Sequence, residues 1–245
     1  MLPVILLIGS DNFANGTGIL RPSTRYARSK SVVFVRPNFR LGVLGFLALE
    51  SLSNSSNVPS SGNYALTDLI AVLEWIKINI QNFGGDPNSV TIFGHRSGST
   101  LATALTAIPR ANKLFSQVWA SSGSFHFPGS PLDISEKNNL EFAVAFPDCK
   151  EKSNWQSKDG EELIKKTPEN WTKEHMTALP GWSENSSDFH DNIVLDGVFL
   201  KEHPEDIWKS SPKNIPKIVI GTTAHVAYDH NSFLSRNLTE EEIVT

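Results

Sequence analysis

The segment SVTIFGHRSGST, residues 89–100, decides the fold of this 245-residue chain. Its first five residues are mostly apolar or β-branched, which predicts a buried strand that ends at Phe93. Residues 99–105 predict the helix that follows. Gly94 and Gly98 flank the junction, so the chain is expected to pass from strand to helix through a tight turn with Arg96 at its apex.

The spacing of the two glycines is that of the G-x-S-x-G turn, which raises a nucleophilic serine above the end of a strand. The central residue here is Arg96. A guanidinium stays protonated and offers no lone pair to a carbonyl carbon, so it cannot act as a nucleophile. Ser97, one residue past the apex, is the residual candidate for the nucleophile. It is a weak candidate because its side chain is expected to point away from the apex. The segment therefore predicts the geometry of a catalytic turn without its chemistry.

Two roles for Arg96 follow from its position before a helix. The helix N-terminus favours negative charge, so Arg96 could anchor an anion there. Alternatively, Arg96 fills the vacated pocket or pairs with a nearby carboxylate, because a lone cation opposes the helix dipole. We favour the second role. His95 is interpreted as a polar neighbour, since a catalytic base needs a nucleophile to contact.

Composition excludes several classes of function. The 22 basic and 26 acidic residues give a net charge of −4, which offers no electrostatic footprint for nucleic acid. No apolar run of about 18 residues is present that would span a bilayer. The histidines show no metal-ligand spacing, and we expect neither a metal nor a cofactor.

Alternating strand and helix patterns predict an α/β fold with a mostly parallel sheet and helices on both faces. Strands are expected at residues 3–8, 31–35, 89–93, 117–121 and 215–221. A helix is expected over 64–83, ended by Gly84, with a turn at Asp86-Pro87. Its apolar stripe comprises Leu66, Leu69, Ile70, Leu73, Ile76 and Ile80.

Three segments carry further expectations. Residues 1–8 are apolar but have no basic leader, so they predict a buried strand, and the chain is expected to begin inside a domain. Residues 51–62 are rich in Ser and Asn and predict an exposed loop. Residues 153–191 are polar and are interpreted as a helical cap or insertion within one partial domain that spans 1–245.

Cysteine, tryptophan and sequon positions bear on location and contacts. Cys149 is the single cysteine, so the compartment is reducing, its partner lies outside the chain, or the thiol is buried and inert. Trp75 and Trp119 are expected to pack in the core, whereas Trp171 and Trp182 are candidate interface residues. The N-x-S/T sequons give glycosylation candidates at Asn15, Asn54, Asn170, Asn185 and Asn237.

Several motifs in a fixed order carry a family resemblance. They are NFRLGVLGF at 38–46, GNY at 62–64, NFGGDP at 82–87, VTIFG at 90–94, SSG at 121–123, LDG at 195–197 and VIGTT at 219–223. This pattern resembles the type-B carboxylesterase and cholinesterase family over nearly the whole chain. The resemblance implies the α/β-hydrolase fold, with this chain as an incomplete fragment that lacks N-terminal strands and the C-terminal part of the domain.

The resemblance also assigns catalytic positions, and those within this chain are degenerate. Arg96 stands at the nucleophile position and Val226 at the position of the acid, where a hydrocarbon cannot orient a histidine. The oxyanion loop aligns with Gly9, Ser10, Asp11 and Asn12. Its missing glycines and the Asp11 carboxylate both oppose stabilisation of an oxyanion. The segment of the catalytic histidine lies beyond Thr245.

The pattern is closest to the non-catalytic, neurotactin-like adhesion members of that family. The resemblance implies a pseudoenzyme that binds protein ligands at the extracellular face of the plasma membrane or after secretion. Self-association is a second kind of contact to test, and the membrane is expected to be reached only through a segment absent from this chain. Two alternatives stay open: a carboxylic ester hydrolase with atypical or residual activity, and a truncated gene model.

Overall fold

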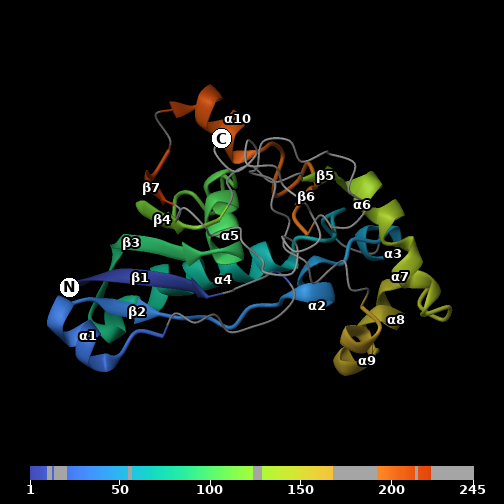
Figure 1. Cartoon of the computed structure of the whole chain (residues 1–245), viewed down its shortest axis with the longest axis horizontal. Helices are drawn as coiled ribbons and strands as arrows, with labels where there is room; N and C mark the ends of the chain where they lie inside the picture. The colour runs from blue at the N-terminus through green and yellow to red at the C-terminus, as the bar shows by residue number, and fades with distance from the viewer. Residues whose placement is uncertain are drawn as a thin grey trace, which may run out of the picture.

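The computed structural model describes residues 1–9, 13, 21–54, 57–123, 129–167, 192–212 and 215–221. Within this part, five parallel strands form a sheet in the order β2-β1-β3-β4-β7 (Figure 1). Their bounds are β1 Leu2–Gly9, β2 Val33–Val35, β3 Gly85–His95, β4 Gln117–Ser121 and β7 Lys217–Gly221. The α/β class is confirmed, and all five predicted strands are present with ends shifted by a few residues.

The remaining described elements are short apart from two helices. They are α1 Thr24–Lys30, α2 Gly42–Phe46, α3 Glu50–Ser53, α4 Tyr64–Asn79, the 3-10 helix η1 Ile80–Phe83, α5 Ser97–Thr106, α6 Leu132–Asn138, α7 Leu140–Val144, α8 Lys152–Gln156, α9 Gly160–Lys165 and α10 Pro204–Ser210. A two-stranded parallel sheet pairs β5 Ser130–Pro131 with β6 Val194–Leu195.

The main core lies between the sheet and helices α4 and α5. The apolar stripe predicted for residues 64–83 is buried at all six positions, five in α4 and one, Ile80, in η1, and α5 contacts β1, β3 and β4. Gly84 ends the helical segment with φ 79°, a left-handed conformation that glycine adopts without steric cost. On the other face of the sheet, Tyr26 of α1 lies against Phe34 of β2, with ring centroids 6.0 Å apart.

Two predictions about where elements begin are corrected. Strand β3 begins at Gly85, so the predicted turn at Asp86-Pro87 falls within the strand bounds. The register between β1 and β3 shifts between Leu2 and Val4, which places the extra residues of β3 in a bulge where proline needs no ladder partner. The helix after the Arg96 turn begins at Ser97, two residues earlier than expected.

The described part of segment 51–62 is not the exposed loop that its composition predicted. Ser53, Ser60 and Ser61 are buried. The hydroxyls of Ser53 and Ser61 are 2.7 Å apart, and the Ser60 hydroxyl donates to Asp196 Oδ2 at 2.6 Å. Serine hydroxyls that find partners can be buried at little cost, which composition alone cannot reveal.

The two tryptophans expected in the core are half exposed. Trp75 is 44% exposed on α4 and Trp119 is 50% exposed on β4. Each lies against one aromatic neighbour, Phe83 at 5.7 Å and Phe93 at 5.8 Å between ring centroids. Both residues belong to core elements, but Trp75 lies on the exposed side of α4 and Trp119 lies on the sheet face that α4 and α5 do not cover.

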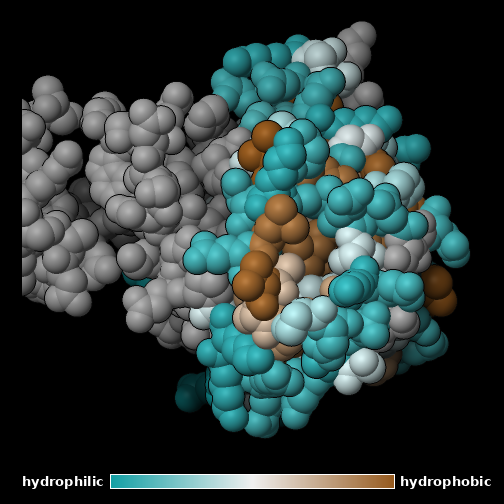
Figure 2. Space-filling view, turned by 90° about the vertical axis from the view of Figure 1, so that its right-hand side faces the viewer, coloured by the Kyte–Doolittle hydropathy of each residue, from teal (hydrophilic) through white to brown (hydrophobic). Residues whose placement is uncertain are grey.

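Helices α6 to α9 gather at the end of the molecule opposite α1 (Figure 1). There α8 contacts α3, and α9 contacts α2. They enclose a second apolar cluster of Val43, Leu47, Leu49, Leu52, Phe142, Phe146, Cys149, Trp155 and Leu163. Figure 2 looks onto this end and shows an apolar patch framed by hydrophilic side chains. Only α8 and α9 of the predicted 153–191 insertion lie among the described residues, so that domain assignment stays a prediction.

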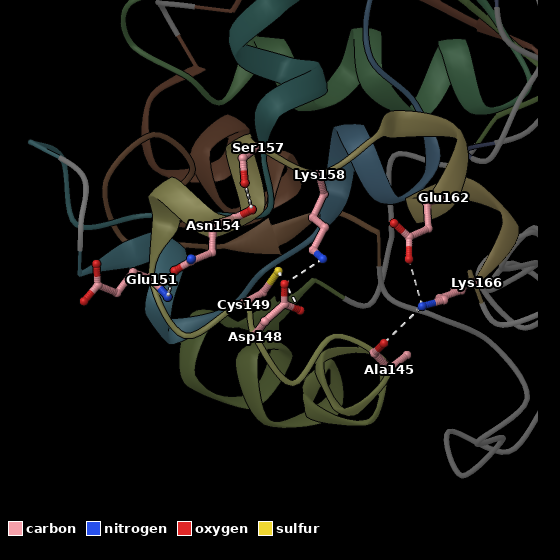
Figure 3. Close-up of polar contacts among 9 residues, drawn as sticks. All are labelled: Ala145, Asp148, Cys149, Glu151, Asn154, Ser157, Lys158, Glu162 and Lys166. Atoms are coloured by element: carbon pink, nitrogen blue, oxygen red, sulfur yellow. Dashed lines mark hydrogen bonds and ion pairs between the residues drawn. The ribbon is translucent and has the colours of Figure 1, made fainter.

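Cys149 is buried in this second cluster, beside the ion pair of Asp148 and Lys158 (Figure 3). Lys158 Nζ lies 2.8 Å from Asp148 Oδ2. Burial, and then the charge of Asp148, raises the pKa of the Cys149 thiol. Of the three alternatives for this cysteine, a buried thiol of low reactivity is the one that the structure describes.

Candidate functional site at the Arg96 turn

The turn between β3 and α5 has the backbone of a strained elbow. Arg96 adopts φ 52° and ψ −125°, a conformation that a residue with a side chain rarely takes. Its N–H donates to the Ser121 carbonyl oxygen at 2.9 Å, and its own carbonyl accepts from the N–H of Ser99 at 2.8 Å and of Thr100 at 3.2 Å. Main-chain hydrogen bonds to both sides therefore hold the apex in place, whichever side chain it carries.

Three glycines make the turn sterically feasible. A Cβ on Gly94 would collide with the carbonyl oxygen of Gly98, and one on Gly98 would collide with the carbonyl oxygen of Ile8. A Cβ on Gly123 would collide with the carbonyl oxygen of Arg96. Each clash involves main-chain atoms, which cannot rotate away as a flexible side chain can. Gly94 and Gly98 therefore keep their places for packing reasons that are independent of a nucleophile.

The Arg96 side chain is exposed, and within the described part of the chain no ion pair involves its guanidinium. The favoured expectation, that Arg96 fills a vacated pocket or pairs with a carboxylate, is therefore not met by these residues. The cation stands at the N-terminus of α5 and faces outward. An exposed cation in this position is compatible with the other role considered from the sequence, an anchor for an anion.

Two described residues, His95 and Gly9, lie next to the apex at the ends of their strands. His95 is the last residue of β3, and its Nδ1 lies 3.3 Å from the Ser121 hydroxyl. Gly9, the first residue of the predicted oxyanion loop, ends β1 directly beside His95 in the sheet register. Ser10, Asp11, Asn12 and Val226 lie outside the described residues, as do Asn15, Asn170, Asn185, Asn237, Trp171 and Trp182.

Ser97 is a poor replacement nucleophile on geometric grounds. It is 2% exposed, in the first turn of α5. The adjacent Gly98 lies against the Ile8 main chain of the sheet. A nucleophile must reach a substrate carbonyl carbon, and the burial of Ser97 in this first turn disfavours such a contact.

Sequence reasoning missed a charged cluster that joins the segment before α2 to helix α4. Arg40 makes a forked pair with Asp68, with Nε–Oδ2 at 2.8 Å and Nη2–Oδ1 at 2.7 Å, and its guanidinium lies 5.0 Å from the centre of the Tyr64 ring. Hydrogen bonding to Asp68 raises the pKa of Arg40, and burial raises the pKa of Tyr64 to about 12. The available signal was Asp68 itself, an acidic residue between the buried Leu66 and Leu69 of α4.

Asp196 has a larger structural role than the turn signal that the sequence suggested. Its Oδ1 accepts from the main-chain N–H groups of Val198, Phe199 and Leu200 at 2.9–3.0 Å, while Oδ2 accepts from Ser60. The carboxylate is buried and satisfied, so it organises the loop after β6.

The described ranges contain no group of side chains suited to a metal ion and no helix suited to a bilayer. No cluster of three or more His, Cys, Asp or Glu side chains suitable for a metal ion occurs there. No helix in those ranges is both long and apolar enough to cross a bilayer.

The fold and the glycine-framed elbow define a protein of the α/β-hydrolase class, and the chain belongs to the carboxylesterase family. A family profile described as "Carboxylesterase family" matches residues 1–244. The family resemblance that we based on the motifs at 38–46, 62–64, 82–87 and 90–94 is therefore confirmed.

Individual relatives agree with this assignment. The chain is 47% identical to Neurotactin of Drosophila melanogaster over 99% of its own length and 29% of that protein. It is 30% identical to Cholinesterase of Mus musculus, over 96% of this chain and 39% of that one. Among solved structures, a PNB esterase superposes with a TM-score of 0.74 at 27% identity, covering 99% of this chain and 50% of the esterase. The chain thus spans half or less of each of these relatives.

Proposed function

We propose that this chain is part of a non-catalytic recognition domain that binds protein ligands at the extracellular face of a cell. The observation that carries the proposal is Arg96, a permanently charged and exposed side chain at the apex of an intact elbow. Acyl transfer through this turn needs a nucleophile at the apex, and a guanidinium cannot supply one.

Two further segments of the sequence support the loss of catalysis. Val226 stands where the resemblance puts the acid, and Ser10, Asp11 and Asn12 stand where it puts the glycines of the oxyanion loop. Loss of one oxyanion donor alone costs about 3–4 kcal/mol of transition-state stabilisation. Together with Arg96, three separate parts of the machinery are replaced, which favours a domain retained for another purpose.

The likeness to Neurotactin supports adhesion as that purpose. The identity of 47% extends over 99% of this chain, and the sequence pattern implies the adhesion branch of the family. Asn54, a glycosylation candidate, is exposed at the end of α3, as an extracellular sequon requires. We place the protein contact at the end of the sheet that carries Arg96, because family sites on this fold lie at the carboxyl ends of the strands.

Two measurements test the proposal. The purified protein is offered a p-nitrophenyl ester and a phosphonate probe, beside its Ser97→Ala variant; no turnover above buffer and no covalent label is expected for either. Beads that carry the protein are then tested for adhesion to cells and to each other. Arg96→Glu is expected to reduce adhesion, whereas Arg28→Glu, an exposed change on α1, leaves it intact.

The outcomes discriminate between recognition and hydrolysis. Turnover that disappears in Ser97→Ala would establish a hydrolase with displaced residues and overturn the proposal. If neither arginine change reduces adhesion, the protein contact does not lie at the end of the sheet that carries Arg96. Beads that adhere to nothing, from a catalytically silent protein, would reject the recognition function itself.

A further inference from the structure

The basic residues of the chain are unevenly distributed, and six of them fall in one segment without acidic residues. Residues 12–49 contain no aspartate or glutamate, so this segment has a net charge of +6 in a chain whose net charge is −4. The basic positions are Arg21, Arg25, Arg28, Lys30, Arg36 and Arg40. The charge of the whole chain therefore conceals a segment of the opposite sign.

Helix α1 carries three of these charges on the surface of the molecule. Arg25, Arg28 and Lys30 are exposed, and the helix buries none of its residues. Arg25 and Arg28 are three residues apart, so their side chains lie on the same side of the helix. Among the described residues, no carboxylate forms an ion pair with any of the three, whereas Arg40 is paired with Asp68. We call Arg25, Arg28 and Lys30 the α1 surface.

The helix that displays these charges is held at both ends. At its start, the Ser23 hydroxyl accepts the main-chain N–H of Tyr26 at 3.1 Å. At its end, Ser31 adopts φ 50° and donates its main-chain N–H back to the last turn. The Tyr26 ring also lies against Phe34 of β2. A helix that is already formed presents its side chains to a ligand at a low entropic cost.

Helix stability does not account for the whole arrangement of these charges. Arg28 and Lys30 lie in the last turn, where the helix dipole favours cations. Arg25 lies in the first turn, where a cation opposes the dipole, and that turn has no acidic residue. Arg25 and Arg28 also repel each other at their spacing. A bound anion would relieve both of these unfavourable interactions.

We propose that the α1 surface binds a linear sulfated polysaccharide of the heparan sulfate class, through ion pairs between its basic side chains and sulfate groups. The argument is charge complementarity. A guanidinium presents planar donors that match two oxygens of a tetrahedral oxyanion, and clustered Lys and Arg residues are typical of nucleic-acid and heparin-binding patches. The choice of an extracellular polyanion rests on the proposed function.

The α1 surface is distinct from the Arg96 turn. Helix α1 leads into the amino end of β2, whereas Arg96 follows the carboxyl end of β3. In Figure 1, α1 lies beside the N-terminal end of β1. The two surfaces therefore belong to opposite ends of the parallel sheet, and each can be changed without the other.

Two other polyanions fit the α1 surface less well. Membrane binding by a basic helix needs an apolar face that enters the lipid, and the one aromatic residue of α1, Tyr26, already lies against Phe34. A DNA duplex is stiff over about 150 base pairs, so it would extend from α1 along a molecule whose net charge is −4.

The test measures the binding of heparin to the purified protein by isothermal titration calorimetry. We expect binding to heparin and none to fully desulfated heparin. The affinity should fall at least about tenfold between about 0.15 M and about 0.5 M salt, because ion pairs with a polyanion release counterions. Phosphatidylserine vesicles and a short DNA duplex are offered at the same salt concentrations and should bind more weakly than heparin.

Matched variants assign the binding to α1. Arg25→Glu combined with Arg28→Glu is expected to weaken heparin binding by at least about tenfold. Lys137→Glu combined with Lys165→Glu is the control, because it changes the net charge equally on exposed parts of α6 and α9, at the opposite end of the molecule. If the α1 double variant does not fold, Arg25→Glu alone serves, since the helix dipole favours an acidic residue in the first turn.

A further comparison separates this inference from the proposed function. Arg96→Glu should leave the heparin affinity within about twofold of the unchanged protein, because the two sites are distant. Adhesion of Arg96→Glu and Arg28→Glu is compared on cells treated with a heparan sulfate lyase, so that the α1 surface contributes nothing to it. Intact adhesion without heparin binding counts against this inference alone, and heparin binding without adhesion counts against the proposed function alone.

Three results would overturn the inference. The first is binding to heparin that does not exceed binding to desulfated heparin. The second is an equal loss of affinity in the α1 variant and in the Lys137 and Lys165 control, which would mean that only the net charge matters. The third is tighter binding to the vesicles or to DNA than to heparin, which would make a different polyanion the ligand.

Discussion

The main-chain N–H of Arg96 donates a 2.9 Å hydrogen bond to the carbonyl oxygen of Ser121, the last residue of the neighbouring strand β4. This bond ties the apex of the elbow to the sheet through backbone atoms alone. The side chain of residue 96 can therefore change without loss of the turn. The conformational strain at this residue comes from its unusual φ of 52°.

Arg96→Gly is expected to stabilise the protein, because glycine relieves the strain of a positive φ. The gain should be about 0.5–1 kcal/mol after the entropic cost of glycine in the unfolded chain. Arg96→Val, which puts a β-branched residue in the same conformation, should lose about 1–2 kcal/mol. Urea denaturation of the three proteins measures the difference; equal midpoints would show that the strain is absent.

Gly98→Ala should destabilise the protein by about 2–4 kcal/mol, because the new Cβ would collide with the main chain of Ile8. Gly160→Ala is the matched control. The nearest atom to its Cβ would be Leu44 Cδ1 at 3.9 Å, and the position opens α9, so alanine should be neutral or slightly stabilising. Thermal melts of both variants provide the comparison, and similar melting temperatures would contradict the packing argument.

Asp68→Asn is expected to cost about 1–2 kcal/mol, because it removes the charge from a partly buried, forked pair with Arg40. Glu74→Gln is the comparison, since Glu74 forms an equally forked pair with Arg110 on the exposed surface. That change should stay within about 0.5 kcal/mol. Urea denaturation at low and high salt checks both values, and salt should weaken the Glu74 pair more.

Stability should fall as the pH rises from about 10 to about 12 because of Tyr64. Burial raises the pKa of this phenol from 10.0 to about 12, so the unfolded chain loses the proton first and unfolding is favoured in that window. Tyr64→Phe should flatten this part of the pH profile, whereas Tyr26→Phe, on an exposed side chain, should not. Denaturation midpoints measured across the window decide between the two results.

The fold was predictable from sequence where periodicity reflects burial. The six apolar positions of α4 and η1 and the five strands follow directly from such patterns, since one face of each element must meet the core. The prediction failed for Ser53, Ser60 and Ser61, whose burial depends on partners distant in sequence. It failed again for Trp119, because strand composition does not say which face of a sheet is covered.

The candidate site was predictable in its chemistry but not in its surroundings. Residue identity alone shows that Arg96 cannot attack a carbonyl carbon. Its exposure, and the burial of Ser97, required the three-dimensional arrangement of β3, α5 and the neighbouring main chain. The fork of Arg40 and Asp68 joins residues 28 positions apart, a separation at which no local pattern operates.

The glycine contacts around the elbow have a consequence for how such proteins are recognised. Because main-chain crowding forbids a larger residue at positions 94, 98 and 123, mutation can remove the reactive group while leaving the surrounding signature readable. A search that scores those glycines will group proteins with a serine at the apex together with proteins that carry another residue there. The residue at the apex distinguishes the two groups when genomes are surveyed for the nucleophile.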